Sequence, residues 1–424
     1  MSGFPRGCKL ALLVLVLLTL APSPLLADSA DTSAPPSPEA PRVEEAEVPS
    51  TERGKTSFLP LPVYATSRNG GDDYGFMPVF LLKEKNEYIY GIFAPSYIYN
   101  KNTGSNLTLR YLGYPTLDKS YRIFVNRSTG VDQEYTGEYW DNRFLGGRFR
   151  LFARATYFRD STFRFFGLTE RSAEEDETDY SNVEFSPEFN LGYYLPHDLV
   201  LSYGEKLRWV YIRRGKVSAL PYIKERFQDL EGINGGAVWK RRLTLTYDTR
   251  DDEVYPGEGW LVNVYGEVGH VFTRTRVFTR LGGDARTFIS FDGQRFTTVV
   301  KGAFQLTGGR KVPFFETASL GGENTLRGLG SYRYRDDSFI LVNIEERIRL
   351  FRLHIFDVWS DWEAAPFVDV GRVYSSFGKQ FFSHYQVNPG VGFRAIVKPN
   401  VVGRVDIGYG NEGLAAFVGI DFPF

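Results

Sequence analysis

The stretch from Gly321 to Asp337, GGENTLRGLGSYRYRDD, carries the residues of this sequence whose types and spacing best suit a specific polar contact. At its centre Arg327 is followed by Gly328, and the segments that come after it carry Glu345 and Asp369. A guanidinium group presents five donors in a fixed fork, and carboxylates fit this fork. The pattern indicates that Glu345 and Asp369 could bind Arg327, and that this contact could pin the stretch.

The side chains most often used in catalysis do not cluster in this sequence. The four histidines, His197, His270, His354 and His384, lie far apart, without the spacing of a metal site or a motif that pairs a nucleophile with a base. The acidic run from Glu174 to Asp179 is more typical of a solvated loop than of a cation site. We expect no enzyme activity, no metal and no cofactor. A hydrolase stays open as an alternative, because catalytic triads assemble in space.

The N-terminus has the order of features of a secretory signal peptide. Basic residues precede the apolar run Leu10 to Leu20, and small residues follow around Ala27, so we expect residues 1–27 to be removed, together with the only cysteine. That run is shorter than the roughly 20 residues of a transmembrane helix, and no comparable run follows it. A net charge of -1 provides no strongly basic face for nucleic acid. We expect an exported protein without a transmembrane helix, a disulfide or a nucleic-acid partner.

Composition and periodicity predict an all-β membrane protein. Residues 28–57, rich in Pro, Ala, Ser and Glu, cannot bury enough apolar surface to fold, and we expect a disordered periplasmic tether. In residues 58–424 many segments of about 10 residues alternate polar and apolar side chains, and no amphipathic helix stands out. An aromatic share of 16% at a mean hydropathy of -0.27 suits a transmembrane antiparallel β-barrel with aromatic girdles.

The number of strands is ambiguous in the sequence. The alternating segments from Tyr74 onward form an odd number, whereas a single-chain bacterial barrel with both ends on the periplasmic side needs an even number. Either Leu59 to Thr66 is a further strand, or two early segments are one bent strand. We expect 16 strands and keep 18 as the alternative.

Alternation also predicts which charges face the lumen. In the segment from Phe339 to Leu350, one face is aliphatic and the other carries Glu345 among further polar residues, so the charged face must point inward. In the segment from Ala365 to Tyr374, the same argument turns Asp369 toward the same interior. The connections from residue 180 onward mostly alternate between short turns and long polar loops, which is typical of periplasmic turns and extracellular loops. The Arg327 stretch lies in one of the long loops.

Several motifs in order resemble those of a known family. They are RFFGLTERS, YDTRDDEVYPGEGW, the LRG of GGENTLRGLG, the N-x-E of LVNIEER, the F-x-D-x-G of FVDVG and the closing GIDFPF. The ordered set is similar to that of the BamA/TamA superfamily of outer-membrane insertases and secretion pores, also called the bacterial surface antigen family. The likeness covers roughly residues 58–424 and is strongest after Arg241.

The resemblance implies a 16-stranded barrel whose long sixth extracellular loop folds into the lumen. Its motif arginine, here Arg327, would be held by Glu345 and Asp369. We call these three residues, with Gly328, the lumen latch. The family also implies a seam between the first and last strands that can open toward lipid. One departure is Leu329, where an aromatic residue usually follows R-G, and it bears on the packing of the loop tip.

A second departure concerns soluble domains. Family members carry periplasmic polypeptide-transport-associated (POTRA) domains before the barrel, and only the tether stands between Ala27 and Phe58, so we expect a reduced form without them. A separate periplasmic partner could then capture clients. The spacing of Gly419, Phe422 and Phe424 resembles the C-terminal signal that the barrel-assembly machinery binds during biogenesis.

The leading hypothesis is an outer-membrane barrel for protein translocation or insertion, surrounded by outer-membrane lipid and plugged by the latched loop, with a polypeptide or lipid as its client. The alternative is a passive outer-membrane channel or structural barrel in which the loop merely narrows the pore.

Overall fold

The structure, a computed structural model, describes residues 54–67, 69–85, 88–253, 255–274, 276–355, 358–375, 383–397, 401–420 and 423. The expected signal peptide and most of the expected tether lie outside these ranges. Within the described ranges, no helix has the length and apolar content needed to cross a membrane. The described chain is built almost entirely from strands.

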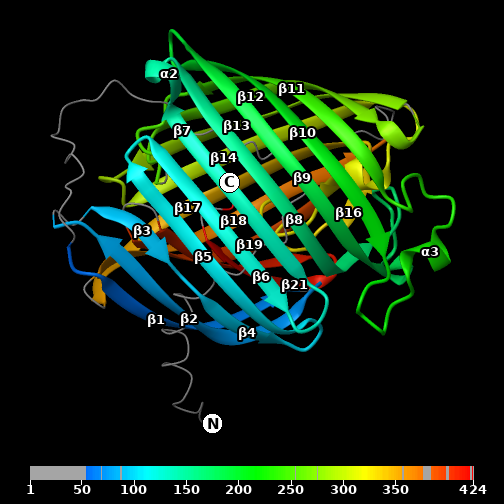
Figure 1. The fold of residues 1–424 in the computed structure, drawn as a ribbon, viewed down its shortest axis with the longest axis horizontal. Coiled ribbons are helices and arrows are strands. Elements are labelled where there is room, and N and C mark those ends of the chain that lie inside the picture. The colour runs from blue at the N-terminus through cyan, green and yellow to red at the C-terminus, as the bar shows by residue number, and fades with distance from the viewer. Residues whose placement is uncertain are drawn as a thin grey trace.

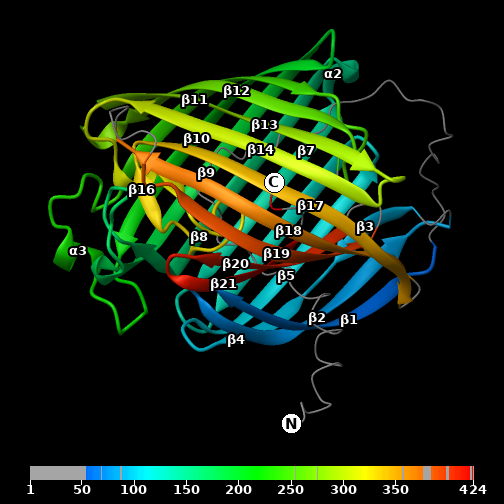
Figure 2. The same cartoon turned by 180° about the vertical axis from the view of Figure 1, so that it is seen from behind.

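One antiparallel sheet of 19 strands curls into a barrel (Figures 1 and 2). Its strands are β1 (Ser57–Ser67), β2 (Gly71–Lys83), β3 (Ile89–Phe93), β4 (Ser96–Asn100), β5 (Gly104–Thr116), β6 (Lys119–Ser128), β7 (Gln133–Arg143), β8 (Phe149–Phe165), β9 (Thr178–Leu195), β10 (Leu199–Arg213), β11 (Gly236–Asp248), β12 (Gly259–Val271), β13 (Arg276–Phe291), β14 (Phe296–Gly308), β17 (Ser338–Ile355), β18 (Val358–Tyr374), β19 (Gln386–Val397), β20 (Val401–Gly410) and β21 (Gly413–Ile420). Apart from β3 and β4, which both pair with β2 and β5, neighbours along the chain pair with each other, and β1 lies against β21. The all-β barrel expected from the sequence is confirmed.

The expected 16 strands are wrong for the described residues. β3 and β4 share one position between β2 and β5, so the 19 strands fill 18 positions. The alternative of 18 strands agrees with the structure, because the segment of β1 is a further strand and no two early segments merge into one. β1 pairs with β2 in full register, with Leu61 opposite Met77. Pro60 and Pro62 disguise β1 in the sequence, because proline has no N–H and is tolerated mainly in edge strands. β1 can hold both because it is the first strand of the sheet.

Outside the sheet lie a small hairpin and a few short turns. The hairpin pairs β15 (Ala318–Leu320) with β16 (Tyr334–Asp336), and the turns are α2 (Phe144–Gly147), α3 (Ile223–Arg226), η2 (Glu174–Asp176), η3 (Phe272–Arg274) and η4 (Phe314–Glu316). The hairpin and η4 belong to residues 309–337, the connection between β14 and β17, which we call the plug loop. From Phe314 to Arg335 nearly all of its residues are buried, and Figure 1 shows β16 at the end of the barrel that carries α3.

The direction of the side chains follows the expected alternation in β17 and β18. Val342 and Ile344 are 37% and 47% exposed on the outer face of β17. Glu345 occupies an inward position of the same strand and is fully buried. Asp369 of β18 is also fully buried, while Val368 beside it faces outward. The polar face of both strands therefore lines the lumen, as a barrel in lipid requires.

The lumen wall is not polar throughout. The inward positions of the first strands form an apolar cluster, made of Leu59, Leu61, Val63, Met77, Val79, Leu81, Ile92, Ala94 and Ile98. The opposite face of the same strands is also apolar, with Phe58 and Phe76 about half exposed. The strands beside the β1–β21 contact are thus apolar on both faces, which the polar-lumen rule does not predict.

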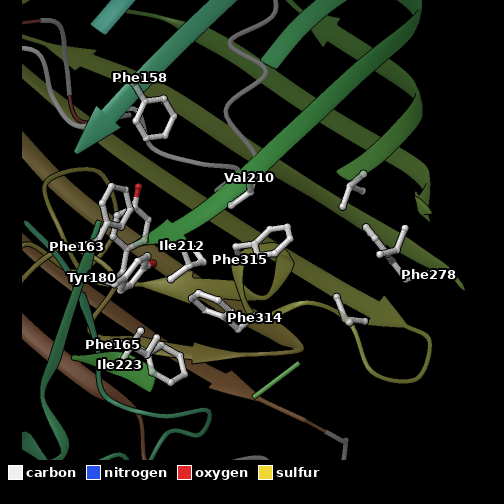
Figure 3. Packing of buried hydrophobic residues seen from close by; sticks show 14 residues of the cluster. Phe158, Phe163, Phe165, Tyr180, Val210, Ile212, Ile223, Phe278, Phe314 and Phe315 are labelled. Carbon is white, nitrogen blue, oxygen red and sulfur yellow. The ribbon is translucent and has the colours of Figure 1, made fainter. Parts of the chain in front are cut away.

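A second apolar cluster covers the end of the barrel that carries α3. Phe314 and Phe315 of the plug loop pack among Phe165, Tyr180 and Ile223, which come from the β8 and β9 strand ends and from α3 (Figure 3). The Phe314 ring contacts those of Phe165 and Tyr180 edge to face, at 5.3 and 5.5 Å between centroids. This packing ties the first part of the plug loop to the loops around it.

Candidate functional site

The structure brings the four residues of the lumen latch together. The backbone N–H and the Nε of Arg327 donate to Oδ2 of Asp369 at 3.0 and 2.9 Å, and Nη2 donates to Oδ1 at 2.8 Å. Nη1 donates to Oε2 of Glu345 at 2.6 Å. The guanidinium carbon lies 3.4 Å from the centroid of the Phe367 ring. The side chains of Arg327, Glu345 and Asp369 are fully buried, so the plug loop is bound to β17 and β18 by a desolvated, two-pronged ion pair.

The carboxylates dominate the electrostatics of Arg327. Burial by itself lowers the pKa of Arg327, but the hydrogen bonds to Asp369 and the charges of Asp369, Glu345 and Asp406 raise it above its ordinary value. The guanidinium group therefore stays charged. A contact of this kind fixes the position of a loop more than it adds stability, because burying the charges has its own cost.

A third carboxylate, Asp406 of β20, joins the two that the sequence pattern singled out. Its Oδ1 lies 3.5 Å from Nη1 of Arg327 and accepts a hydrogen bond from Nη2 of Arg394 at 2.8 Å. Arg394 of β19 also donates to Glu345 at 3.0 Å. The charged residues therefore join β17, β18, β19 and β20. Neither Asp406 nor Arg394 was predicted from the sequence. Both stand at inward positions of strands in which polar and apolar side chains alternate, and this alternation is the signal that could have identified them.

Glycine at position 328 is required by the approach of the plug loop to β20. A Cβ on Gly328 would lie 2.6 Å from the carbonyl carbon of Tyr409 and 2.7 Å from Nδ2 of Asn388. From the other side, a Cβ on Gly408 would meet the carbonyl of Arg327. Since two backbones can approach this closely only without side chains, Gly328 and Gly408 set the contact between loop and strand.

The residue after the R-G pair is packed despite its departure from the family pattern. Leu329 is fully buried, in a cluster with Leu320, Leu326 and Leu341. Because Leu320 and Leu326 belong to the plug loop and Leu341 to β17, an aliphatic side chain at this position joins the loop tip to the wall.

The plug loop also holds the turn between β20 and β21. Arg333 forms an ion pair with Glu412, and Nδ2 of Asn411 donates to the hydroxyl of Tyr334 at 3.0 Å. Nη1 and Nη2 of Arg404, on β20, donate to the carbonyl and a carboxylate oxygen of Glu323, each at 3.1 Å. The loop therefore contacts the last hairpin of the barrel along its length, next to the contact between β21 and β1.

The expected C-terminal assembly signal falls largely outside the described residues. Gly419 pairs with Arg404 in the β20–β21 ladder, whereas Phe422 and Phe424 are not among the described residues. The role of these three residues stays a prediction.

The histidines stay apart, as their positions in the sequence suggest. His270 lies beside Arg241, His354 beside Trp359, and His384 beside Arg171. In the part of the chain that the structure describes, no three His, Cys, Asp or Glu side chains come together as a metal site would need.

The protein is a barrel with a long loop that folds inward, and an arginine of this loop binds carboxylates of the wall. Comparison with known proteins identifies the family to which this barrel belongs. The Omp85 superfamily domain model matches residues 119–410, about two thirds of the sequence, from β6 to β20. The chain belongs to the Omp85 superfamily, and it is therefore a bacterial outer-membrane protein. The resemblance to the BamA/TamA superfamily is thereby confirmed. No curated protein matches the chain.

Two solved structures share the fold. BamA from Haemophilus ducreyi lacking POTRA domains 1-3 is 13% identical, with a TM-score of 0.52 over 86% of this chain and 75% of the BamA chain. CdiB from Escherichia coli is 13% identical, with a TM-score of 0.53 over 88% of this chain and 63% of the CdiB chain. The chain thus spans less than two thirds of that CdiB chain. At this identity the likeness shows the fold.

Proposed function

We propose that this protein is an outer-membrane barrel for inserting or secreting polypeptides, with its lumen plugged by the plug loop and the loop held by the lumen latch. Omp85 barrels, BamA and CdiB among them, insert or secrete proteins. The observation that carries the proposal is the buried contact of Arg327 with Asp369 and Glu345. It holds the tip of the loop inside the barrel.

The latch controls the plug because its contact is buried. Removing one partner of a buried ion pair leaves the other charge uncompensated and costs about 3–5 kcal/mol. In the closed state, the loop therefore stays in the lumen. A client or partner that offers Arg327 or the carboxylates a replacement contact releases the loop at a much smaller cost.

The route for the client is the seam between β1 and β21. Pro60 and Pro62 remove two backbone donors from β1. An edge that pairs weakly can separate and accept a strand of a client by backbone hydrogen bonding, and lipid then lies directly beside it.

Planar-bilayer conductance of the purified protein and of Arg327→Ala tests this function. We expect little steady conductance for the wild type and a clear rise for the variant, because the tip of the plug loop is no longer held against β17 and β18. A large, steady conductance that Arg327→Ala does not change would identify a passive pore instead.

The client is tested separately, by photocrosslinking in the native outer membrane from probes along β1 and β21. Captured polypeptides support the proposed function. Capture of lipid alone would replace the polypeptide client with a lipid one.

A further inference from the structure

Glu316 is a buried carboxylate of the plug loop with no part in the lumen latch. Its Oε1 accepts a hydrogen bond from Nη1 of Arg208 at 2.6 Å, and its Oε2 accepts one from Nη2 of Arg280 at 2.9 Å. The Nζ of Lys240 lies 3.6 Å from Oε2. The side chain of Glu316 is fully buried. Three wall cations thus surround one loop carboxylate, the reverse of the arrangement in which three wall carboxylates surround Arg327.

The wall cations belong to other strands than the carboxylates of the lumen latch. Arg208 lies on β10, Lys240 on β11 and Arg280 on β13, and their neighbours Glu184 and Glu267 come from β9 and β12. The lumen latch and Asp406 involve β17, β18 and β20. The plug loop leaves the sheet after β14 and returns at β17, so the two charged groups hold it on either side of its own point of entry.

Glu316 stands at the base of the loop hairpin and Arg327 at its tip. β15 begins two residues after Glu316, and its ladder with β16 places Ser319 opposite Arg335. The turn η4 directs Glu316 toward the wall cations, while Phe314 and Phe315 of the same turn enter the aromatic cluster (Figure 3). Arg280 and Arg208 also bind the backbone carbonyls of Glu316 and Phe315, so the cations hold the main chain as well as the carboxylate.

Glu316 stays charged in these surroundings. Burial by itself raises the pKa of Glu316, but the charges of Lys240, Arg208 and Arg280 together lower it to about 2. The carboxylate therefore attracts the cations throughout the neutral and mildly acidic range.

We propose that Glu316 is a second anchor of the plug loop, which fixes the base of the hairpin to β10, β11 and β13 independently of the contact that Arg327 makes at the tip. The inference rests on the proposed function only in treating residues 309–337 as a plug. Two anchors on different stretches of wall prevent the hairpin from turning about its point of entry. Loss of one anchor then loosens only the end of the loop that it holds, and complete release of the plug requires both ends to detach. Glu316 is a positioning residue for that step.

Limited trypsin digestion of the protein in lipid vesicles tests the second anchor. Arg335 lies in β16 and Arg333 directly before it. They are 5% and 3% exposed and should resist cleavage. Arg310 and Lys311 are exposed and serve as an internal standard. In Glu316→Gln we expect cleavage after Arg335 to become at least about tenfold faster, because local opening of the hairpin base exposes the site. Cleavage after Arg310 should stay unchanged.

Glu258→Gln is the matched control, because Glu258 is an exposed carboxylate in the turn between β11 and β12. Its plug loop should remain as resistant as that of the wild type. Heat-modifiable migration in gel electrophoresis shows in every case whether the barrel has folded. A folded Glu316→Gln barrel with wild-type resistance after Arg335 overturns the proposal.

A second variant guards against loss of folding. Glu316→Gln leaves the wall cations with one negative charge fewer, so the pair Glu316→Gln with Lys240→Met removes one charge of each sign. If only this pair folds, faster cleavage after Arg335 supports the anchor and wild-type resistance overturns it. If neither barrel folds, Glu316 serves to neutralise the wall and the proposal fails. None of these outcomes depends on conductance or on a client, so a failure of the proposed function is distinguishable from a failure of the second anchor.

Discussion

Arg327 donates three hydrogen bonds to the carboxylate of Asp369, two from its side chain and one from its backbone N–H. The backbone donor matters, because it places the main chain of the plug loop, and not only a flexible side chain, against β18. Glu345 accepts a single hydrogen bond from Arg327 and is shared with Arg394. The two carboxylates of the lumen latch are therefore not equivalent.

Asp369→Asn should release the loop tip more than Glu345→Gln does. The amide of asparagine would point a donor at the guanidinium group or lose one of the two oxygens that bind it, and breaking such a buried pair costs about 3–5 kcal/mol. In Glu345→Gln, Asp369 still binds both prongs of Arg327. Planar-bilayer conductance compares the two variants, and a larger rise for Glu345→Gln would contradict this ranking.

Gly328→Ala should open the plug although it leaves every charge in place. The added methyl group would lie 2.6 Å from the carbonyl carbon of Tyr409, so the loop must move away from β20. Gly302→Ala, on β14, is the control, because a Cβ there meets nothing within 4 Å. We expect conductance to rise for Gly328→Ala and to stay at the wild-type level for Gly302→Ala. Equal conductance in the two variants would show that the close approach does not hold the loop.

A photoreactive phenylalanine at Phe58 should capture clients, and one at Phe291 should not. Both side chains are exposed on the outer face, 49% and 54%, but Phe58 lies on β1 at the seam and Phe291 on β13. The pair therefore differs in position rather than in exposure. Crosslinking in the native membrane, followed by mass spectrometry, reports the captured polypeptides. Similar capture from both sites would exclude a route restricted to the seam.

The anchor at Glu316 should not respond to mild acid. Its carboxyl has a pKa of about 2 in the folded protein, below the ordinary value of 4.5, because Lys240, Arg208 and Arg280 outweigh the effect of burial. A carboxyl group with a lowered pKa stabilises the folded protein fully at pH values above its ordinary pKa. This stabilisation is lost only as the pH falls from the ordinary pKa toward about 2. Conductance of the wild type should therefore be constant from about pH 8 to about pH 5. A steep rise within that range would show that another group controls the plug.

Much of the architecture can be predicted from local patterns in the sequence. Alternation along β17 and β18 identified the lumen face, and with it the inward direction of Glu345 and Asp369, because successive side chains of a strand point to opposite faces whatever the partner strand. The arginine and glycine of the plug loop were likewise visible, since few residue types suit a two-pronged contact or a close backbone approach. The membership of the chain in its superfamily followed from the order of such motifs.

The strand count shows where local patterns mislead. The prolines of β1 weaken the strand pattern in its sequence. Only the β1–β2 ladder, in which Leu59 lies opposite Val79, shows that the segment is a strand. The apolar lumen face of β1 to β4 could not be predicted from the local pattern either. Where both faces of a strand are hydrophobic, the alternation does not reveal which face is inside.

The partners of the charges were decided only by the tertiary structure. Asp406 meets Arg327 because β20 lies beside the loop tip, and Glu316 meets Arg208, Lys240 and Arg280 because the loop base turns toward β10 to β13. The sequence determined which side chains point inward, since that depends on a period of two residues within each strand. Which inward charges meet depends on strand register, on the closure of the barrel and on the path of a loop between distant walls, and none of these is a property of neighbouring residues.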